Sequence, residues 1–103
     1  MESELPTGEE LQLESVLHAL SDPQRLKVVR ALAEDPTARP CGSFDLNVSK
    51  STKTHHFRVL RESGLITQEA QGNCRMTTLR REDIDARFPG LLDAVLAADA
   101  VPA

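Results

Sequence analysis

The segment from Ser49 to Gly64 predicts one helix whose two ends are both specified. Ser49 suits the N-cap position because its hydroxyl can accept a hydrogen bond from a free backbone amide of the first turn, and Gly64 suits the left-handed residue that ends many helices. Phe57 and Leu60 fall on one face of this helix. The opposite face carries short polar and basic side chains: Lys50, Ser51, Thr52, Thr54, His55 and Arg58. The helix therefore packs through a narrow apolar stripe and leaves a cationic surface exposed.

Charge is concentrated around this helix. Residues 49–81 contain seven Lys or Arg and two acidic residues, a net charge of +5, although the whole chain has a formal charge of −4. The remaining residues therefore carry −9. A basic segment in an acidic protein is typical of a phosphate-binding surface, because lysine and arginine release counterions from a polyanion. An ordinary solvated helix could carry the same charges, so charge alone leaves both interpretations open.

A β-hairpin is predicted directly after the helix. Residues 65–71 and 74–79 are strand-like runs on either side of Gly72 and Asn73, a pair that tolerates the positive backbone angles of a two-residue turn. A hairpin that follows a basic helix is typical of a winged DNA-binding domain.

This order of elements resembles the winged helix-turn-helix of the ArsR/SmtB family of bacterial transcriptional regulators. Residues 19–26 are similar to the family's entry to its second helix, and residues 50–66 are similar to its recognition-helix signature. Lys53 departs from the pattern, because the family usually has an apolar residue there. We expect its stem to pack and its ammonium group to point outward, with either a small stability cost or an extra phosphate contact.

The other elements predict a mainly α, dimeric winged helix-turn-helix with a small β-hairpin wing. Apolar spacing predicts a first helix over about 9–20, and Asp22 caps a second helix that begins with Pro23 and ends at Asp35 and Pro36. A short third helix is expected over 44–48, before the helix at Ser49. A last helical segment starts near Glu82, is interrupted at residues 89–90 and continues over 91–98. Residues 9–99 form one domain between an acidic tail, 1–8, and a C-terminal tail, 100–103.

The resemblance implies a homodimer that forms through the first and last helices. The apolar residues expected at the dimer contact are Leu13, Val16, Leu17, Leu91, Leu92, Val95 and Leu96. The alternative is that the last helix folds back on the core of its own protomer.

The resemblance also implies sequence-specific binding to double-stranded DNA, as a repressor at an inverted-repeat operator. The residues expected to read bases or nearby phosphates are Lys50, Ser51, Thr52, Thr54 and His55, and those expected to contact the phosphate backbone are Arg58, Arg75 and Arg80. The alternative is a winged-helix module whose basic face binds an acidic protein. No phosphate-binding glycine loop, nucleophile elbow or paired carboxylates indicate an enzyme.

The regulatory input is less constrained by the sequence. Cys41 is expected just before the short third helix and Cys74 beside Arg75, two positions that favour a thiolate, so both are candidate redox or effector thiols. Small cysteines that only fill gaps in the core are the simpler interpretation. We expect no metal site and no cofactor, because soft ligands are not clustered and His55 and His56 point about 100° apart around a helix. The acidic N-terminus and the lack of a long apolar run predict a cytoplasmic protein.

Overall fold

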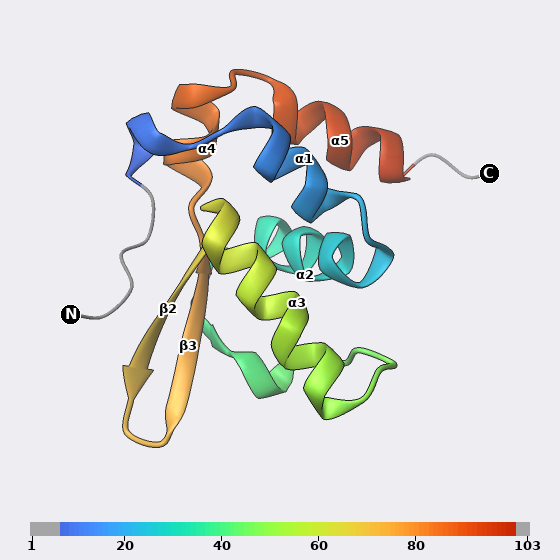
Figure 1. Ribbon diagram of the computed structural model, residues 1–103, viewed down its shortest axis with the longest axis vertical. Helices are drawn as coiled ribbons and strands as arrows, with labels where there is room; N and C mark the ends of the chain where they lie inside the picture. Colours follow the sequence, from blue (N-terminus) through green and yellow to red (C-terminus); the bar gives the residue numbers. More distant parts are fainter. Residues whose placement is uncertain (1–6, 101–103) are drawn as a thin grey trace.

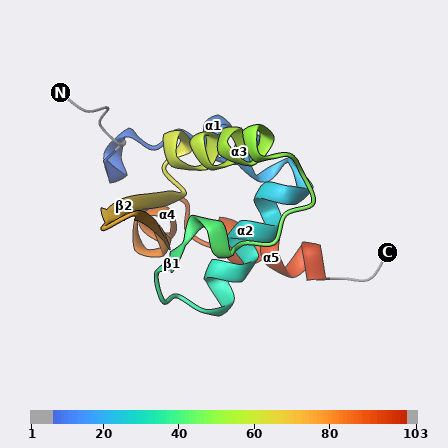
Figure 2. The same cartoon turned by 90° about the horizontal axis from the view of Figure 1, so that it is seen from below.

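The computed structural model describes residues 7–100, which form a helical domain with a small antiparallel sheet (Figures 1 and 2). In chain order the elements are the 3₁₀ turn η1 (Gly8–Glu10), α1 (Leu13–Leu20), α2 (Pro23–Glu34), β1 (Arg39–Pro40), the 3₁₀ turn η2 (Cys41–Ser43), α3 (Lys50–Ser63), β2 (Ile66–Gln71), β3 (Cys74–Leu79), α4 (Arg81–Arg87) and α5 (Leu91–Ala100). The second helix, the helix after Ser49, the wing and the break before residue 91 confirm the winged helix-turn-helix prediction. The first helix, expected from about residue 9, begins only at Leu13, because residues 8–10 form η1 and residues 11–12 are not helical. Most of the predicted N-terminal tail lies outside the described residues, and its last residue, Gly8, begins η1. Of the predicted C-terminal tail, only Ala100 is described, at the end of α5.

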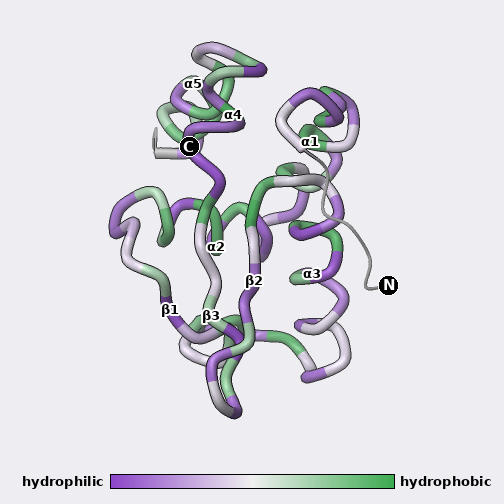
Figure 3. Tube along the Cα trace, turned by 90° about the vertical axis from the view of Figure 1, so that its left-hand side faces the viewer, coloured by the Kyte–Doolittle hydropathy of each residue, from purple (hydrophilic) through white to green (hydrophobic). Residues whose placement is uncertain are grey.

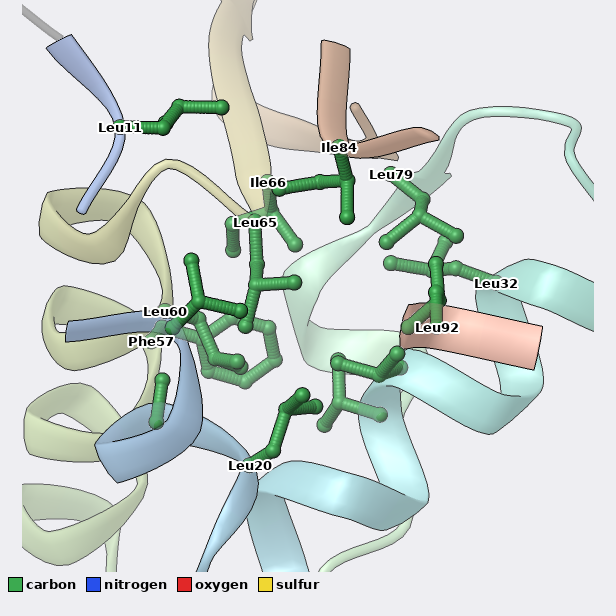
Figure 4. Packing of buried hydrophobic residues seen from close by; sticks show 14 of the residues in the cluster. Leu11, Leu20, Leu32, Phe57, Leu60, Leu65, Ile66, Leu79, Ile84 and Leu92 are labelled. Atoms are coloured by element: carbon green, nitrogen blue, oxygen red, sulfur yellow. The ribbon is translucent and has the colours of Figure 1, made fainter. Parts of the chain in front are cut away.

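The core lies where α1, α2 and α3 meet the base of the sheet and the two C-terminal helices (Figure 4). Leu60, Leu65, Ile66 and Ile84 are fully buried there. The core is mostly aliphatic, and its aromatic pair is Phe44 and Phe57, whose ring centroids are 5.5 Å apart. Within residues 7–100, no helix has the length and apolar character needed to cross a membrane.

The two predicted ends of α3 are confirmed. The Ser49 hydroxyl accepts a hydrogen bond from the Thr52 amide at 3.2 Å. Gly64 has φ 91°, a left-handed conformation that a side chain would strain, and its amide donates to the carbonyls of Leu60 and Arg61. These caps mark the two ends of α3, at residues 50 and 63.

The predicted start of α2 is also confirmed. Asp22 is its N-cap, and one carboxylate oxygen accepts hydrogen bonds from the amides of Gln24 and Arg25 at 2.8 and 3.3 Å. Partial burial alone would raise the pKa of the Asp22 carboxyl. Those two amides, together with the nearby His56 and Arg25 side chains, outweigh burial and hold the pKa below its ordinary value.

Asp22→Ala should therefore lower the free energy of unfolding by about 1 kcal/mol at pH 7, the usual value of an N-cap. Because the folded-state pKa is depressed, this stabilisation is present above the unfolded-state pKa of about 3.9 and is lost as the pH falls through the folded-state value. Urea unfolding should show the difference between the two proteins shrinking below about pH 4. Asp22→Asn keeps an acceptor without the charge, so its smaller loss should not follow this pH dependence. An equal Asp22→Ala effect at pH 7 and pH 3 would contradict the assignment.

The wing is the β2–β3 hairpin, paired from Ile66 with Leu79 to Gln71 with Cys74. Gly72 has φ 62° in its turn, whereas Asn73, the other residue of the predicted pair, does not have a positive φ. The sequence pattern missed β1, which pairs with β3 at Arg39 and Pro40 and makes a three-stranded sheet in the order β1-β3-β2. Two residues with a proline carry no strand pattern, and proline is tolerated because β1 is an edge strand.

The predicted third helix over 44–48 is wrong. Residues 44–48 are irregular backbone that follows η2. Phe44, Leu46 and Val48 lie two residues apart, which is the period of extended chain rather than of a helix. The carbonyls of Phe44 and Asp45 accept hydrogen bonds from lysine ammonium groups at 2.7 and 2.8 Å instead of from helical amides.

Two of the residues expected at the dimer contact belong to the core of the protomer. Val16 and Leu92 are both fully buried within the single chain. Leu92 lies near Leu32 and Leu79 (Figure 4), so this face of α5 folds back on its own domain. The expectation that these two side chains contact a partner is wrong, because α1 and α5 each use one apolar face internally.

Candidate nucleic-acid interface

The first half of α3 and the turn of the wing lie at the same end of the molecule, the lower end in Figure 1. The wing turn is largely hydrophilic (Figure 3), and α1, α4 and α5 lie at the opposite end. The side chains predicted to contact DNA on α3 and the wing are all exposed: Lys50, Ser51, Thr52, Thr54, His55, Arg58 and Arg75. The fold therefore brings the predicted contact residues of both elements to one end.

Hydrogen bonds divide the polar residues of α3 into two groups. The Ser49 hydroxyl donates to the Thr52 hydroxyl at 2.9 Å, and the Thr54 hydroxyl donates to the Lys50 carbonyl at 3.1 Å. The hydroxyls of residues 52 and 54 are thus partly used within the helix. The exposed Ser51 hydroxyl also lies 3.3 Å from the Ser49 hydroxyl, whereas the exposed His55 ring makes no hydrogen bond within residues 7–100.

A cleft of about 470 Å³ separates α3 from the wing and η2. Its lining includes five basic side chains and no acidic one: Lys50, Lys53, Arg58, Arg61 and Arg75. Phe57, whose side chain is nearly buried, and Cys41 contribute its less polar lining. A concave surface with uncompensated cations attracts anions, and an elongated polyanion fits a cleft that is open to solvent.

Two of these cations are oriented by contacts within the protein. The Arg61 guanidinium donates to the Gln68 side-chain carbonyl of β2 at 3.1 Å, which ties α3 to the wing. The Lys53 ammonium donates to the Phe44 carbonyl at 2.7 Å. Lys53 is half-buried, so its stem packs as predicted, but its charge is directed to the segment before α3 and not outward.

Arg80 lies apart from the other predicted DNA-contacting residues. It follows the last residue of β3, at the base of the hairpin, and only 10% of its side chain is exposed. Its guanidinium donates twice to the Asp83 carboxylate, at 3.0 and 2.9 Å. The sequence prediction grouped Arg80 with the wing, but the position at the base of the strand and the acid on α4 give it a structural role.

Arg61 was missed as a cleft residue by the sequence prediction. The sequence feature that could have identified it is helical spacing. Arg61 shares one face of the helix with Lys50, Thr54 and Phe57. That face is the one turned towards the wing, which is visible only once the hairpin is placed.

The candidate thiols occupy different surroundings. Cys41 is half-buried, lines the cleft and begins η2, and the short third helix expected after it is absent. Cys74 is exposed on β3, directly after the wing turn. Within residues 7–100, no three His, Cys, Asp or Glu side chains form a group that could hold a metal ion.

This fold and its basic face define the class of winged helix-turn-helix DNA-binding regulators. The family model described as "Bacterial regulatory protein, arsR family" matches residues 22–68. The HTH-type transcriptional regulator YceK of Bacillus subtilis is 30% identical over 82 residues, which cover 78% of this chain and 82% of the relative. The chain belongs to the arsR family of bacterial regulatory proteins and is a DNA-binding transcriptional regulator.

Solved structures show the same fold. The transcriptional repressor BigR of Xylella fastidiosa has a TM-score of 0.65 and 22% identity, covering 87% of this chain and 88% of its own. An ArsR-like transcriptional regulator of Rhodococcus sp. RHA1 has a TM-score of 0.63 and 22% identity, covering 84% and 82%.

Proposed function

We propose that this regulator binds an inverted-repeat operator as a homodimer and represses transcription there. The observation that carries the proposal is the cleft between α3 and the wing, lined by five cations and no acidic residue. The structurally similar protein from Xylella fastidiosa is a repressor, which supports the direction of regulation.

The cleft lies between α3 and the wing, and one DNA strand can pass between these two walls. With α3 in the major groove, Ser51 and His55 face base edges, and the wing reaches beyond the adjoining phosphates. The phosphodiester backbone between the grooves then lies along the cleft, where Arg58 and Arg75 are exposed. Arg61, held by Gln68, keeps the separation of the two walls constant.

Dimerisation is supported by an apolar face on α1. Leu13 and Leu17 are 45% and 43% exposed, and they lie one helical turn apart. Leu91, Val95 and Leu96 of α5 are partly buried at the same end of the molecule. Exposed leucines on a small domain indicate a partner surface, and a second copy covers them while placing two recognition helices on one face of DNA.

The proposal is tested by selecting the sequences that the protein binds from random duplex DNA. The selected sites should be inverted repeats whose half-site centres are about 10–10.5 base pairs apart, or a whole number of turns further, because two recognition helices meet major grooves about 34–36 Å apart. Affinity for the selected site should exceed affinity for random duplex by about 10³-fold or more. Sites without two-fold symmetry would contradict the homodimer, and no enriched sequence would contradict operator recognition.

A further inference from the structure

Arg25 of α2 is a buried arginine at the meeting point of three helices. Its side chain spans from the carboxyl end of α1 to the middle of α3, and the residue is only 6% exposed. Nε donates to the Ala19 carbonyl at 2.8 Å, and Nη2 donates to the His18 carbonyl at 3.1 Å. Nη1 lies 3.2 Å from Nδ1 of His56, which is also 6% exposed.

The contact between Arg25 and His56 determines which ring nitrogen of His56 accepts a hydrogen bond. A guanidinium has only donors, so Nδ1 of His56 must be the acceptor, and the neutral ring carries its proton on Nε2. Nε2 faces the Asp22 carboxylate at 3.8 Å, which favours the same tautomer. Asp22 itself is held by the first amides of α2. The imidazole is thus oriented from both sides by groups on α2.

These contacts act on the helix that carries the DNA-reading residues. His56 follows His55 directly in α3, so the contact that orients the buried ring also limits rotation of the exposed face. The carbonyls bound by Arg25 end α1, the helix with the exposed Leu13 and Leu17. The positive charge of the guanidinium stabilises them, because the last carbonyls of a helix carry partial negative charge, and the His18 carbonyl also accepts hydrogen bonds from the Ser21 amide and hydroxyl.

We propose that Arg25 is a positioning residue for DNA recognition, holding α3 through His56 and fixing it to the end of α1. Base-reading side chains act only when they are held to about 0.5 Å of their productive geometry. A loosened Arg25–His56 contact therefore lowers affinity for the operator more than it alters the fold. The inference rests on the DNA-binding function of the chain, and it assigns a role in recognition to a residue that does not contact DNA.

The test uses two histidine replacements that differ in where they place an acceptor. His56→Asn can put its side-chain carbonyl where Nδ1 lies, whereas His56→Gln places its amide near Nε2 and leaves Arg25 without that acceptor. His56→Asn should keep operator affinity within about threefold of wild type, and His56→Gln should lose about tenfold, the size of a hydrogen bond to a charged group. Fluorescence anisotropy with a selected operator measures both, after circular dichroism and sedimentation have established equal folding and assembly.

A second variant, Arg25→Met, removes the guanidinium and keeps an apolar side chain of similar length. Combined with His56→Gln, it should weaken operator binding no further than the worse single variant, because the Arg25–His56 contact is already absent in each single variant. Equal affinity of the Asn and Gln variants would overturn the proposal, as would ¹⁵N NMR that finds the His56 proton on Nδ1. Because wild-type affinity is measured alongside, a protein that does not bind DNA at all is distinguished from a failed positioning role. If Arg25→Met does not fold, the histidine pair and the tautomer still decide the question.

Discussion

Replacing Leu13 and Leu17 together with glutamate should convert the proposed dimer to monomers at micromolar concentration and lower operator affinity by about 100-fold or more. Both side chains are exposed in the protomer, so the new charges cost little there. In the dimer each unpaired charge would be buried, at a cost of several kcal/mol. A monomer binds one half-site, so it loses the increase in affinity that comes from binding two linked half-sites. Sedimentation velocity and anisotropy with a selected operator measure the two effects.

The matched control places two glutamates at the start of the same helix, away from the leucine face. Gln12→Glu at the N-cap of α1 with Ser15→Glu in its first turn changes the charge by the same amount at two exposed positions. This variant should remain dimeric. A leucine variant that stays fully dimeric with a normal circular dichroism spectrum would show that the partner surface lies elsewhere. Leu92 is unsuitable for such a test, because a charge at this buried residue would act on the fold of the protomer itself.

His55→Ala and Ser51→Ala should relax sequence preference, whereas Arg75→Ala should weaken binding to all duplexes alike. Each lost base contact costs about 1–3 kcal/mol of discrimination at one position of the site. A lost phosphate contact leaves preference unchanged and reduces the slope of log affinity against log salt by about one unit. Repeating the selection with each variant, and titrating selected and random duplexes at several salt concentrations, separates the two kinds of contact.

Arg87→Ala serves as the control for Arg75→Ala. It removes the same charge from α4, at the end of the molecule opposite the wing turn, where its guanidinium donates to the Leu11 carbonyl at 3.1 Å. Its salt slope should match that of wild type. Variants of His55, Ser51 and Arg75 that all bind like wild type would exclude this orientation of α3 and the wing on DNA.

The helices and the wing could be predicted because their signals are local. Ser49 and Gly64 specify the ends of α3, and Asp22 with Pro23 specifies the start of α2, through hydrogen bonds to the nearest few residues. Exposure of the basic face followed from helical spacing alone. The arrangement of these elements in space was predicted from the family resemblance, because local sequence patterns do not specify it.

The errors concern contacts between distant segments. In the irregular segment before α3, Lys53 and Lys27, from α3 and α2, donate hydrogen bonds to backbone carbonyls. Leu92 could not be assigned to the core rather than to a partner, since an apolar helix face looks the same in both cases. The Arg25–His56 contact joins residues 31 positions apart. No local pattern in the sequence indicates that these two polar side chains meet.

The separation of charge along the molecule also affects how quickly it finds DNA. Basic residues line the end formed by α3 and the wing, whereas acidic residues such as Glu9, Glu10 and Glu82 belong to η1 and α4 at the other end. The protein is therefore an electric dipole, and the field of a DNA duplex exerts a torque that turns the basic end inward before contact. Encounters in the reversed orientation are repelled, so a larger share of collisions begins with the recognition helix facing the grooves.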